Sequence, residues 1–376
     1  MTQLIYYAEL TWLEVADLPR DCPMVLPLGD GYAWNKVAEA LSNPTKMVIF
    51  PTFPYGWRGS LLYLPENVLT GILLNLLQSV RDDGFTQIFV LTPSGLDLKL
   101  GCTQIVQRIN QPLSDYFSLN DLEKVVLIPI GHTEQHGYHL PLSTDTEIIN
   151  AIAQGVIINL PEKSISLPVM PYGVSTHRDS FAGTLNAGGR AFEDFTLSIL
   201  DALVQKGFTR FYLMSGHGGN CSFLVNVVKY AGERYPNIFC ATSYLYLNTP
   251  EGIKELETHR QSAIGGMGHA CELETSLMLC LRPELVHMEK VVDETEFIST
   301  PSYYMDWIEG GSLVANPPWT DDTQTGAYGA GSLGTREKGQ IWLESAIREK
   351  INQVHEIEEQ YQRRLPRKIR AGKYHK

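Results

Sequence analysis

Short apolar runs alternate with longer amphipathic stretches along most of this chain, and this alternation limits the folds that are available to it. The stretch AFEDFTLSILDALVQKGF (191–208) has apolar residues at helical spacing, which predicts a helix. The short runs are rich in β-branched and aromatic residues, which favours strands; they are MVIFPTF (47–53), QIFVLTP (87–93), KVVLIPI (124–130), SISLPVMPYG (164–173), RFYLMSG (210–216) and IFCATSY (238–244). Strand followed by helix, repeated, predicts an α/β layered sandwich with a largely parallel central sheet.

The order of motifs in residues 1–115 is repeated in the chain that follows. The matching pairs are MVLPLGDG with VLIPIGHTEQHG, FPYG with MPYG, and GFT at 84–86 with GFT at 207–209. We interpret residues 1–115 as a truncated, degenerate α/β repeat that kept packing positions, lost the polar ones and serves a structural or interface role. Convergent α/β patterning is the alternative. Residues 116–352 then form the catalytic domain, and residues 353–376 form a charged helical or disordered tail.

Composition excludes several classes of partner. The 376 residues are 44% hydrophobic, which is enough for a large core, and the net charge of -12 argues against nucleic-acid binding. No apolar run reaches the roughly 18 residues that indicate a membrane span. The amino terminus does not resemble a signal peptide, and the six scattered cysteines contain no CxxC pair. We therefore expect a soluble, cytoplasmic protein with reduced thiols.

The first polar cluster follows the expected strand at 124–130, in GHTEQHGYHLPLSTD (131–145). Glu134 and His136 are two residues apart, so an extended segment directs both side chains to the same side. Asp145 follows after enough chain for a loop to fold back. Two carboxylates and an imidazole suit zinc or manganese. Taken alone, this cluster favours an ordinary polar loop whose histidines form hydrogen bonds.

The second cluster is the glycine-rich turn after the expected strand at 210–216, where His217 precedes Gly218, Gly219 and Asn220. Such carboxyl-end turns bind ligands in open α/β sheets, and Asn220 is a candidate cap for the next helix. The alternatives are a tight turn with an incidental histidine and a phosphate-binding loop. Since neither alternative requires a histidine, we favour His217 as a metal ligand.

The third cluster is HACELETS (269–276), which precedes a helix-like run. On a helix, Glu272 and Glu274 point about 200° apart, so both face one site only if the helix begins between them. Acidic residues that complement a helix dipole are the alternative. Buried charges persist only when paired or bound to metal, and three such clusters at neighbouring strand exits together predict a metal centre.

These motifs resemble the creatininase (creatinine amidohydrolase) family. EQHGYHLPLSTD, PYGVS…FAGT, GHGGN and HACELETS occur in the family's order over roughly residues 115–350. The resemblance implies an α/β fold, a centre of two divalent ions (zinc, manganese or both), and hydrolysis of a carbon–nitrogen bond. It also implies assembly into a homo-oligomer.

The resemblance assigns a role to each polar residue. It implies that Glu134 and His217 bind one metal ion, that His136 and Glu274 bind the second, and that Asp145 bridges the two. His269 matches a histidine that transfers a proton, and Glu272 matches an acidic neighbour that holds a second water. Whether Glu272 or Glu274 is the ligand stays open.

The expected function is a metal-dependent amidohydrolase that cleaves a small cyclic or linear amide, other than a peptide bond, by attack of a metal-bridging hydroxide. The alternatives are a peptidase or lactonase of the same family, or a non-catalytic metal-binding scaffold. Creatinine-hydrolysing members carry Tyr-Glu where this chain has Gly218-Gly219, so creatinine is not the expected substrate. The candidate substrate-binding residues are Gly218, Gly219, Trp307 and Trp319. The two tryptophans lie in a loop at 299–322 that is expected to be a lid or a subunit-contact loop, with an ordinary surface excursion as the alternative.

Overall fold

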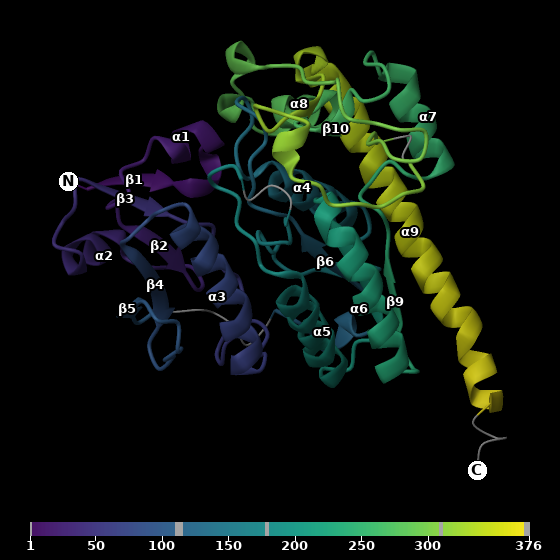
Figure 1. Cartoon of the computed structure of the whole chain (residues 1–376). Helices are drawn as coiled ribbons and strands as arrows, with labels where there is room; N and C mark the ends of the chain where they lie inside the picture. Colours follow the sequence, from purple (N-terminus) through teal and green to yellow (C-terminus); the bar gives the residue numbers. More distant parts are fainter. Residues whose placement is uncertain (1, 110–115, 177–179, 308–310, 372–376) are drawn as a thin grey trace.

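The computed structural model describes residues 2–109, 116–176, 180–307 and 311–371. Two separate parallel sheets lie side by side, and helices cover their faces (Figure 1). This mixed α/β architecture with parallel sheets confirms the predicted fold class. Each of the six apolar runs expected to be strands contains one, although SISLPVMPYG forms a strand of only three residues.

The first unit, residues 2–109, contains a five-stranded sheet in the order β1-β3-β2-β4-β5, with every neighbouring pair parallel. Its strands are β1 (Gln3–Tyr6), β2 (Met24–Pro27), β3 (Lys46–Ile49), β4 (Ile88–Pro93) and β5 (Thr103–Gln107). Its helices are α1 (Trp12–Ala16), α2 (Trp34–Ala40) and α3 (Glu66–Asp82).

The second unit, from residue 116 onward, contains a four-stranded parallel sheet in the order β7-β6-β8-β9. Its strands are β6 (Val125–Ile130), β7 (Ser164–Ser166), β8 (Arg210–Ser215) and β9 (Phe239–Thr242). Its helices are α4 (Thr144–Asn159), α5 (Gly189–Gln205), α6 (Cys221–Arg234), α7 (Pro250–His259), α8 (Glu272–Leu281) and α9 (Arg336–Ala371). A small antiparallel pair, β10 (Met267–His269) with β11 (Tyr328–Gly329), brings the late glycine-rich segment beside His269.

The two sheets share a strand order and register. The order β3-β2-β4-β5 in the first unit corresponds to β7-β6-β8-β9 in the second. Met24 pairs with Ile88, as Val126 pairs with Phe211. The Gly29 amide donates to the Phe53 carbonyl at 2.9 Å, and the Gly131 amide donates to the Met170 carbonyl at the same distance. These correspondences fall on the residues that the motif pairs align, and the interpretation of residues 1–115 as a repeat stays a prediction.

The two units are packed together around one apolar core. Helix α3 of the first unit packs on α5 of the second, and buried residues of both belong to the same cluster. The Phe53 ring stacks on Tyr172 across the boundary, with ring centroids 5.6 Å apart. The first unit is therefore fixed against the second by apolar contact rather than attached by a linker alone.

Helix α9 continues well past the expected end of the catalytic domain at residue 352. Residues 353–371 of the expected tail are helical and extend α9, while residues 372–376 lie outside the described residues. Figure 1 shows the end of this helix projecting beyond the sheets. Among the described residues, no helix is long and apolar enough to cross a membrane.

Candidate metal centre

The polar clusters meet at one edge of the second sheet. Strands β6 and β8 are parallel neighbours, so the loops after their carboxyl ends emerge at the same edge. The loop after β6 carries Glu134 and His136 and leads into α4, and the turn after β8 carries His217. His269 at the end of β10 and Glu274 in the first turn of α8 contact the same site. This topology explains why residues far apart in sequence lie within contact distance.

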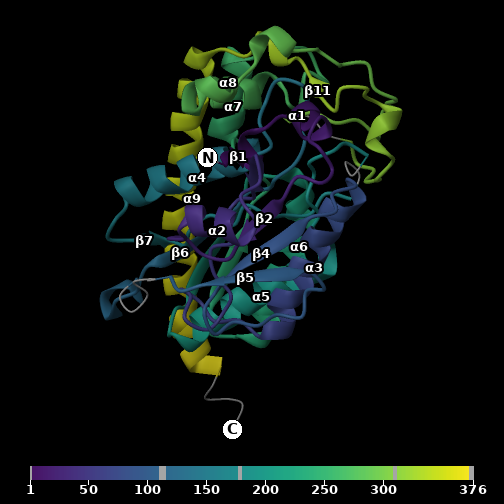
Figure 2. The same ribbon diagram turned by 90° about the vertical axis from the view of Figure 1, so that its left-hand side faces the viewer.

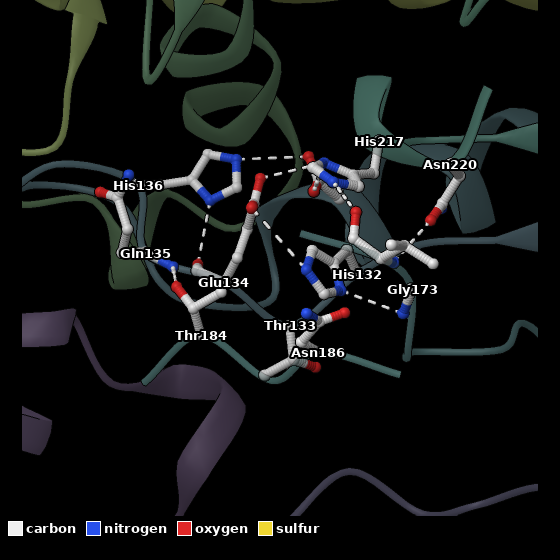
Figure 3. Close-up of polar contacts among 12 residues, drawn as sticks. His132, Thr133, Glu134, Gln135, His136, Gly173, Thr184, Asn186, His217 and Asn220 are labelled. Carbon is white, nitrogen blue, oxygen red and sulfur yellow. Dashed lines mark hydrogen bonds and ion pairs between the residues drawn. The ribbon is translucent and has the colours of Figure 1, made fainter. Parts of the chain in front are cut away.

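One half of the cluster surrounds His217. Its Nδ1 lies 3.0 Å from Glu134 Oε1 and 3.2 Å from Asp145 Oδ2. Figure 3 shows Glu134, His132 and His217 pointing toward one another from two loops. The three form one set of donor atoms that lie within 4.8 Å of one another. The predicted pair of Glu134 and His217 is therefore brought together.

The other half surrounds His136. Its Nε2 lies 3.2 Å from Asp145 Oδ1 and 4.0 Å from Glu274 Oε1. His136, Asp145 and Glu274 form a further set of close donor atoms. Asp145 thus directs one carboxylate oxygen to each half, which is the arrangement of a bridging ligand.

Three of the imidazoles, those of His136, His217 and His269, each bond a backbone carbonyl through one ring nitrogen. His136 Nδ1 lies 3.1 Å from the Glu134 carbonyl oxygen, and His217 Nε2 lies 2.9 Å from that of Val174. His269 Nε2 lies 2.7 Å from that of Gln135. Because a carbonyl oxygen only accepts, each of these nitrogens carries the hydrogen, and the other nitrogen of a neutral ring is left as a ligand or base.

The cluster is buried and strongly coupled. Glu134 and His136 are fully buried, and Asp145, His217, His269 and Glu274 are each at most 4% exposed. Burial lowers the pKa of His217, but the Glu134 and Asp145 carboxylates outweigh it and raise the pKa to about 9. Burial raises the pKa of Asp145, but His136 and His217 together outweigh burial, so that the pKa lies below its usual value. The buried carboxylates therefore raise the pKa of both His136 and His217, which favours the protonated imidazoles.

Two helix amino termini also face the cluster. Asp145 is in the first turn of α4 and Glu274 in that of α8, where the helix dipole favours negative charge. Glu274 Oε2 accepts from the Ala270 amide at 2.5 Å, which fixes the direction of its other oxygen. Three buried carboxylates with imidazole nitrogens are a donor set that fits zinc or manganese. The residues present therefore fit divalent metal ions.

Glu272 is not part of this cluster. Its carboxylate accepts from the Gln261 and Ser262 amides at 2.9 and 2.8 Å and from Lys338 Nζ at 2.6 Å. These partners hold its pKa below the usual value against the effect of burial. The reason is helical spacing: α8 begins at Glu272, so the side chain two residues before Glu274 points to another face of the helix. Glu272 was predicted to be a catalytic residue at this centre, but its carboxylate faces Lys338 and two backbone amides instead.

The predicted substrate-binding residues separate into two groups. Gly218 and Trp307 line a small pocket over the cluster, together with Asp145, His217, Tyr244 and Met305. Gly219 is instead packed tightly beneath the turn, since a Cβ there would lie 2.4 Å from the Val174 carbonyl oxygen. Trp319 is also buried, with its ring edge toward His269 at 5.8 Å between centroids. Trp307 therefore lines this pocket and Trp319 packs against His269, and the substrate-binding roles of both stay predictions.

Three residues to which sequence reasoning assigned no role at the metal centre, His132, Asn220 and Gln135, complete the surroundings. His132 stacks on His217, accepts from the Gly173 amide at Nδ1, and directs Nε2 to Glu134 Oε2 at 3.7 Å. Asn220 accepts from the Val174 amide and donates to the Gly131 carbonyl, so it ties the two loops together; it does not cap α6 as expected. His132 could have been found from its spacing, because residues 132, 134 and 136 alternate on an extended segment. Gln135 has no such signal.

Comparison with known proteins identifies the family. Residues 114–354 match the family described as creatinine amidohydrolase. The chain is 26% identical to a creatinine amidohydrolase from Pseudomonas putida over 59% of this chain and 85% of that protein. It is 30% identical to a mycofactocin precursor peptide peptidase from Mycolicibacterium smegmatis over 46% of this chain and 64% of that protein.

Solved structures agree with the fold. A creatininase described with Mn has a TM-score of 0.52 at 24% identity and covers 62% of this chain and 91% of its own. A mutant creatininase of Zn-Zn type has a TM-score of 0.51 at 25% identity and covers 62% and 90%. Since the family match spans more than half of the chain and includes every ligand candidate, this protein belongs to the creatininase family of hydrolases.

Proposed function

We propose that this protein is an amidohydrolase that cleaves a small cyclic or linear amide other than a peptide, and that its buried cluster would hold two divalent ions, zinc, manganese or both, with Asp145 as the shared ligand. The supporting observation is the position of Asp145, whose two oxygens lie 3.2 Å from His136 and 3.2 Å from His217. Glu134 completes the His217 half and Glu274 the His136 half. The name of the Pseudomonas putida relative supports the reaction class.

The chain's own residues supply orientation and proton transfer. When bound, the two ions supply an activated water and polarise the amide carbonyl. His269 is held by the Gln135 carbonyl at Nε2, so Nδ1 faces the centre, 3.8 Å from Glu134 Oε1. That nitrogen can accept a proton and return it to the leaving nitrogen of the substrate. Glu272 has no part in this step, because Lys338 and two amides occupy its carboxylate.

In the turn after β8, two backbone amides already donate hydrogen bonds within the protein and are therefore not candidates to stabilise an oxyanion. The Gly216 amide donates to the Ile130 carbonyl and the His217 amide to Ser215 Oγ. The backbone amides of Gly218 and Gly219 are therefore the candidates in this turn, and Gly218 lines the pocket. Trp307 and Tyr244 supply aromatic walls there, which suits a small planar amide.

A second candidate function is cleavage of a peptide, which the mycofactocin peptidase relative favours.

A metal-free sample prepared with a chelator, and the same sample restored with zinc or manganese, should be assayed on cyclic amides, linear amides, short peptides and lactones. We expect activity on small amides only in the restored sample. Equal hydrolysis by metal-free and restored protein contradicts the metal mechanism, and turnover of peptides alone favours the second candidate. No turnover on any substrate supports the scaffold alternative.

Assembly into a homo-oligomer and a cytoplasmic location stay predictions.

A further inference from the structure

The loop that carries the ligand candidates is bound to the backbone of the first unit. The Leu142 amide donates to the Leu10 carbonyl at 2.9 Å, and the Leu142 carbonyl accepts from the Glu134 amide at 3.1 Å. The Ser143 amide donates to the Ala8 carbonyl at 2.9 Å. Residues 8–10 therefore run alongside the start of α4, with one hydrogen-bonded residue between them and Glu134.

Trp12 contacts the same loop at Tyr138 and also bonds the segment that holds Gln135. Its Nε1 donates to the Thr325 carbonyl at 2.8 Å, and the next carbonyl, that of Gly326, accepts from Gln135 Nε2 at 2.9 Å. Its ring packs against Tyr138 with centroids 5.5 Å apart. Figure 2 shows α1, which begins at Trp12, beside β11. Trp12 thus holds the segment that in turn holds Gln135, the residue between Glu134 and His136.

A third set of contacts comes from α3 and the residue after it. Asp83 Oδ2 accepts from the Gly183 amide at 2.9 Å, and Ser79 Oγ accepts from the Asn186 amide at 3.0 Å. Between these two, Thr184 Oγ1 accepts from the Gln135 amide at 3.1 Å. Gln135 is therefore reached from the first unit along two independent routes, and its own carbonyl orients His269.

We propose that the first unit positions the loop that carries the metal ligands. Trp12 is the positioning residue, and its replacement is expected to weaken metal binding. The proposal rests on the proposed function for its metal, yet it concerns residues that lie before the family match, which begins at residue 114. Residues that orient ligands without binding the metal alter its affinity by about 10–100-fold. Trp12 acts through Thr325, Gly326 and Gln135, so we expect a smaller effect of about three- to tenfold.

A matched pair of variants tests the proposal. W12F removes the Nε1 donor and keeps an aromatic ring, and W34F makes the same change at another half-buried tryptophan of the first unit, which packs in a separate apolar cluster. Zinc affinity is measured by competition with a chromophoric chelator, and amide hydrogen exchange is measured on the metal-free proteins. We expect W12F alone to weaken zinc binding about three- to tenfold and to speed exchange in residues 131–146.

Equal zinc affinity and equal exchange at residues 131–146 in W12F, W34F and the unchanged protein overturn the proposal. Exchange that is faster over the whole of W12F indicates general destabilisation and also counts against it. If W12F does not fold, S79A repeats the comparison through the second route. If the unchanged protein binds zinc but hydrolyses no amide, the proposed function fails, and the zinc affinities of W12F and W34F still test the role of Trp12. If it does not bind zinc, the hydrogen exchange of the metal-free proteins still tests that role.

Discussion

At the scale of single residues, the structure separates groups that the sequence presents as equivalent. Glu272 and Glu274 are two positions apart in one motif, yet only Glu274 faces His136. Glu272 is fully buried and forms an ion pair with Lys338 at 2.6 Å. Their different partners predict different consequences of the same substitution.

E272Q should lower the free energy of unfolding and leave zinc affinity unchanged. E274Q should lower zinc affinity and leave the stability of the metal-free protein unchanged. Removing one partner of a buried pair leaves the charge of Lys338 uncompensated, which costs about 3–5 kcal/mol. Urea unfolding of the metal-free proteins and zinc competition give the two quantities. A loss of zinc affinity in E272Q larger than in E274Q shows that the ligand is assigned to the wrong glutamate.

The raised pKa of Asp83 predicts that the stability of the protein depends on pH. Burial raises its pKa to about 6, and the Gly183 amide and Arg20 only partly offset this. A carboxyl group with a raised pKa binds its proton more tightly in the folded state, so stability falls as pH rises from about 4 to about 6. D83N should therefore raise the unfolding midpoint above pH 6 and lose this advantage below pH 4, as thermal unfolding across pH would show. An advantage that grows toward low pH reverses the expected sign.

At the scale of elements, strand exits could be predicted from sequence and the contacts between loops could not. The runs 124–130 and 210–216 predicted β6 and β8, and with them the edge where His136 and His217 meet. Periodicity also limited Glu272 and Glu274 to different helix faces. Trp319 and Gln135 carry no periodic signal, because loops with positive-φ turns, such as the one at Gly326, decide what they contact. The first unit's contact with the ligand loop likewise depends on tertiary packing.

The turn after β8 predicts opposite outcomes for neighbouring glycines. A Cβ at Gly219 would lie 2.4 Å from both His217 Nε2 and the Val174 carbonyl oxygen that orients it, whereas at Gly218 the nearest atom is the Tyr244 hydroxyl at 3.6 Å. G219A should thus weaken zinc binding about tenfold, and G218A should leave it unchanged and alter KM. Competition with a chelator and steady-state kinetics measure these effects. Equal zinc affinity in the two variants contradicts the described packing of the turn.

At the scale of the whole molecule, two sheets with a common strand order share one core. We propose that residues 1–115 arose as a repeat, since Met24 pairs with Ile88 as Val126 pairs with Phe211. The described residues of this unit contain no cluster of possible metal ligands. It packs through α3 on α5, and its backbone also accepts hydrogen bonds from Leu142 and Ser143 of the loop that leads into α4.

A shared core predicts that the two units unfold together. L73A removes a fully buried side chain of α3 and should cost about 2–5 kcal/mol, while L74A on the exposed side of the same helix, where the residue is 38% exposed, should cost little. We expect one transition, shifted in L73A for probes in both units. Two separate transitions, with the second unit unaffected by L73A, contradict a common core.

The most direct test of the central claim is anomalous diffraction from crystals of the protein grown with zinc or manganese. The account predicts two anomalous peaks, one on each side of the Asp145 carboxylate, the first beside His217 and Glu134 and the second beside His136 and Glu274. A single peak, or metal bound elsewhere while these side chains contact one another directly, would contradict it.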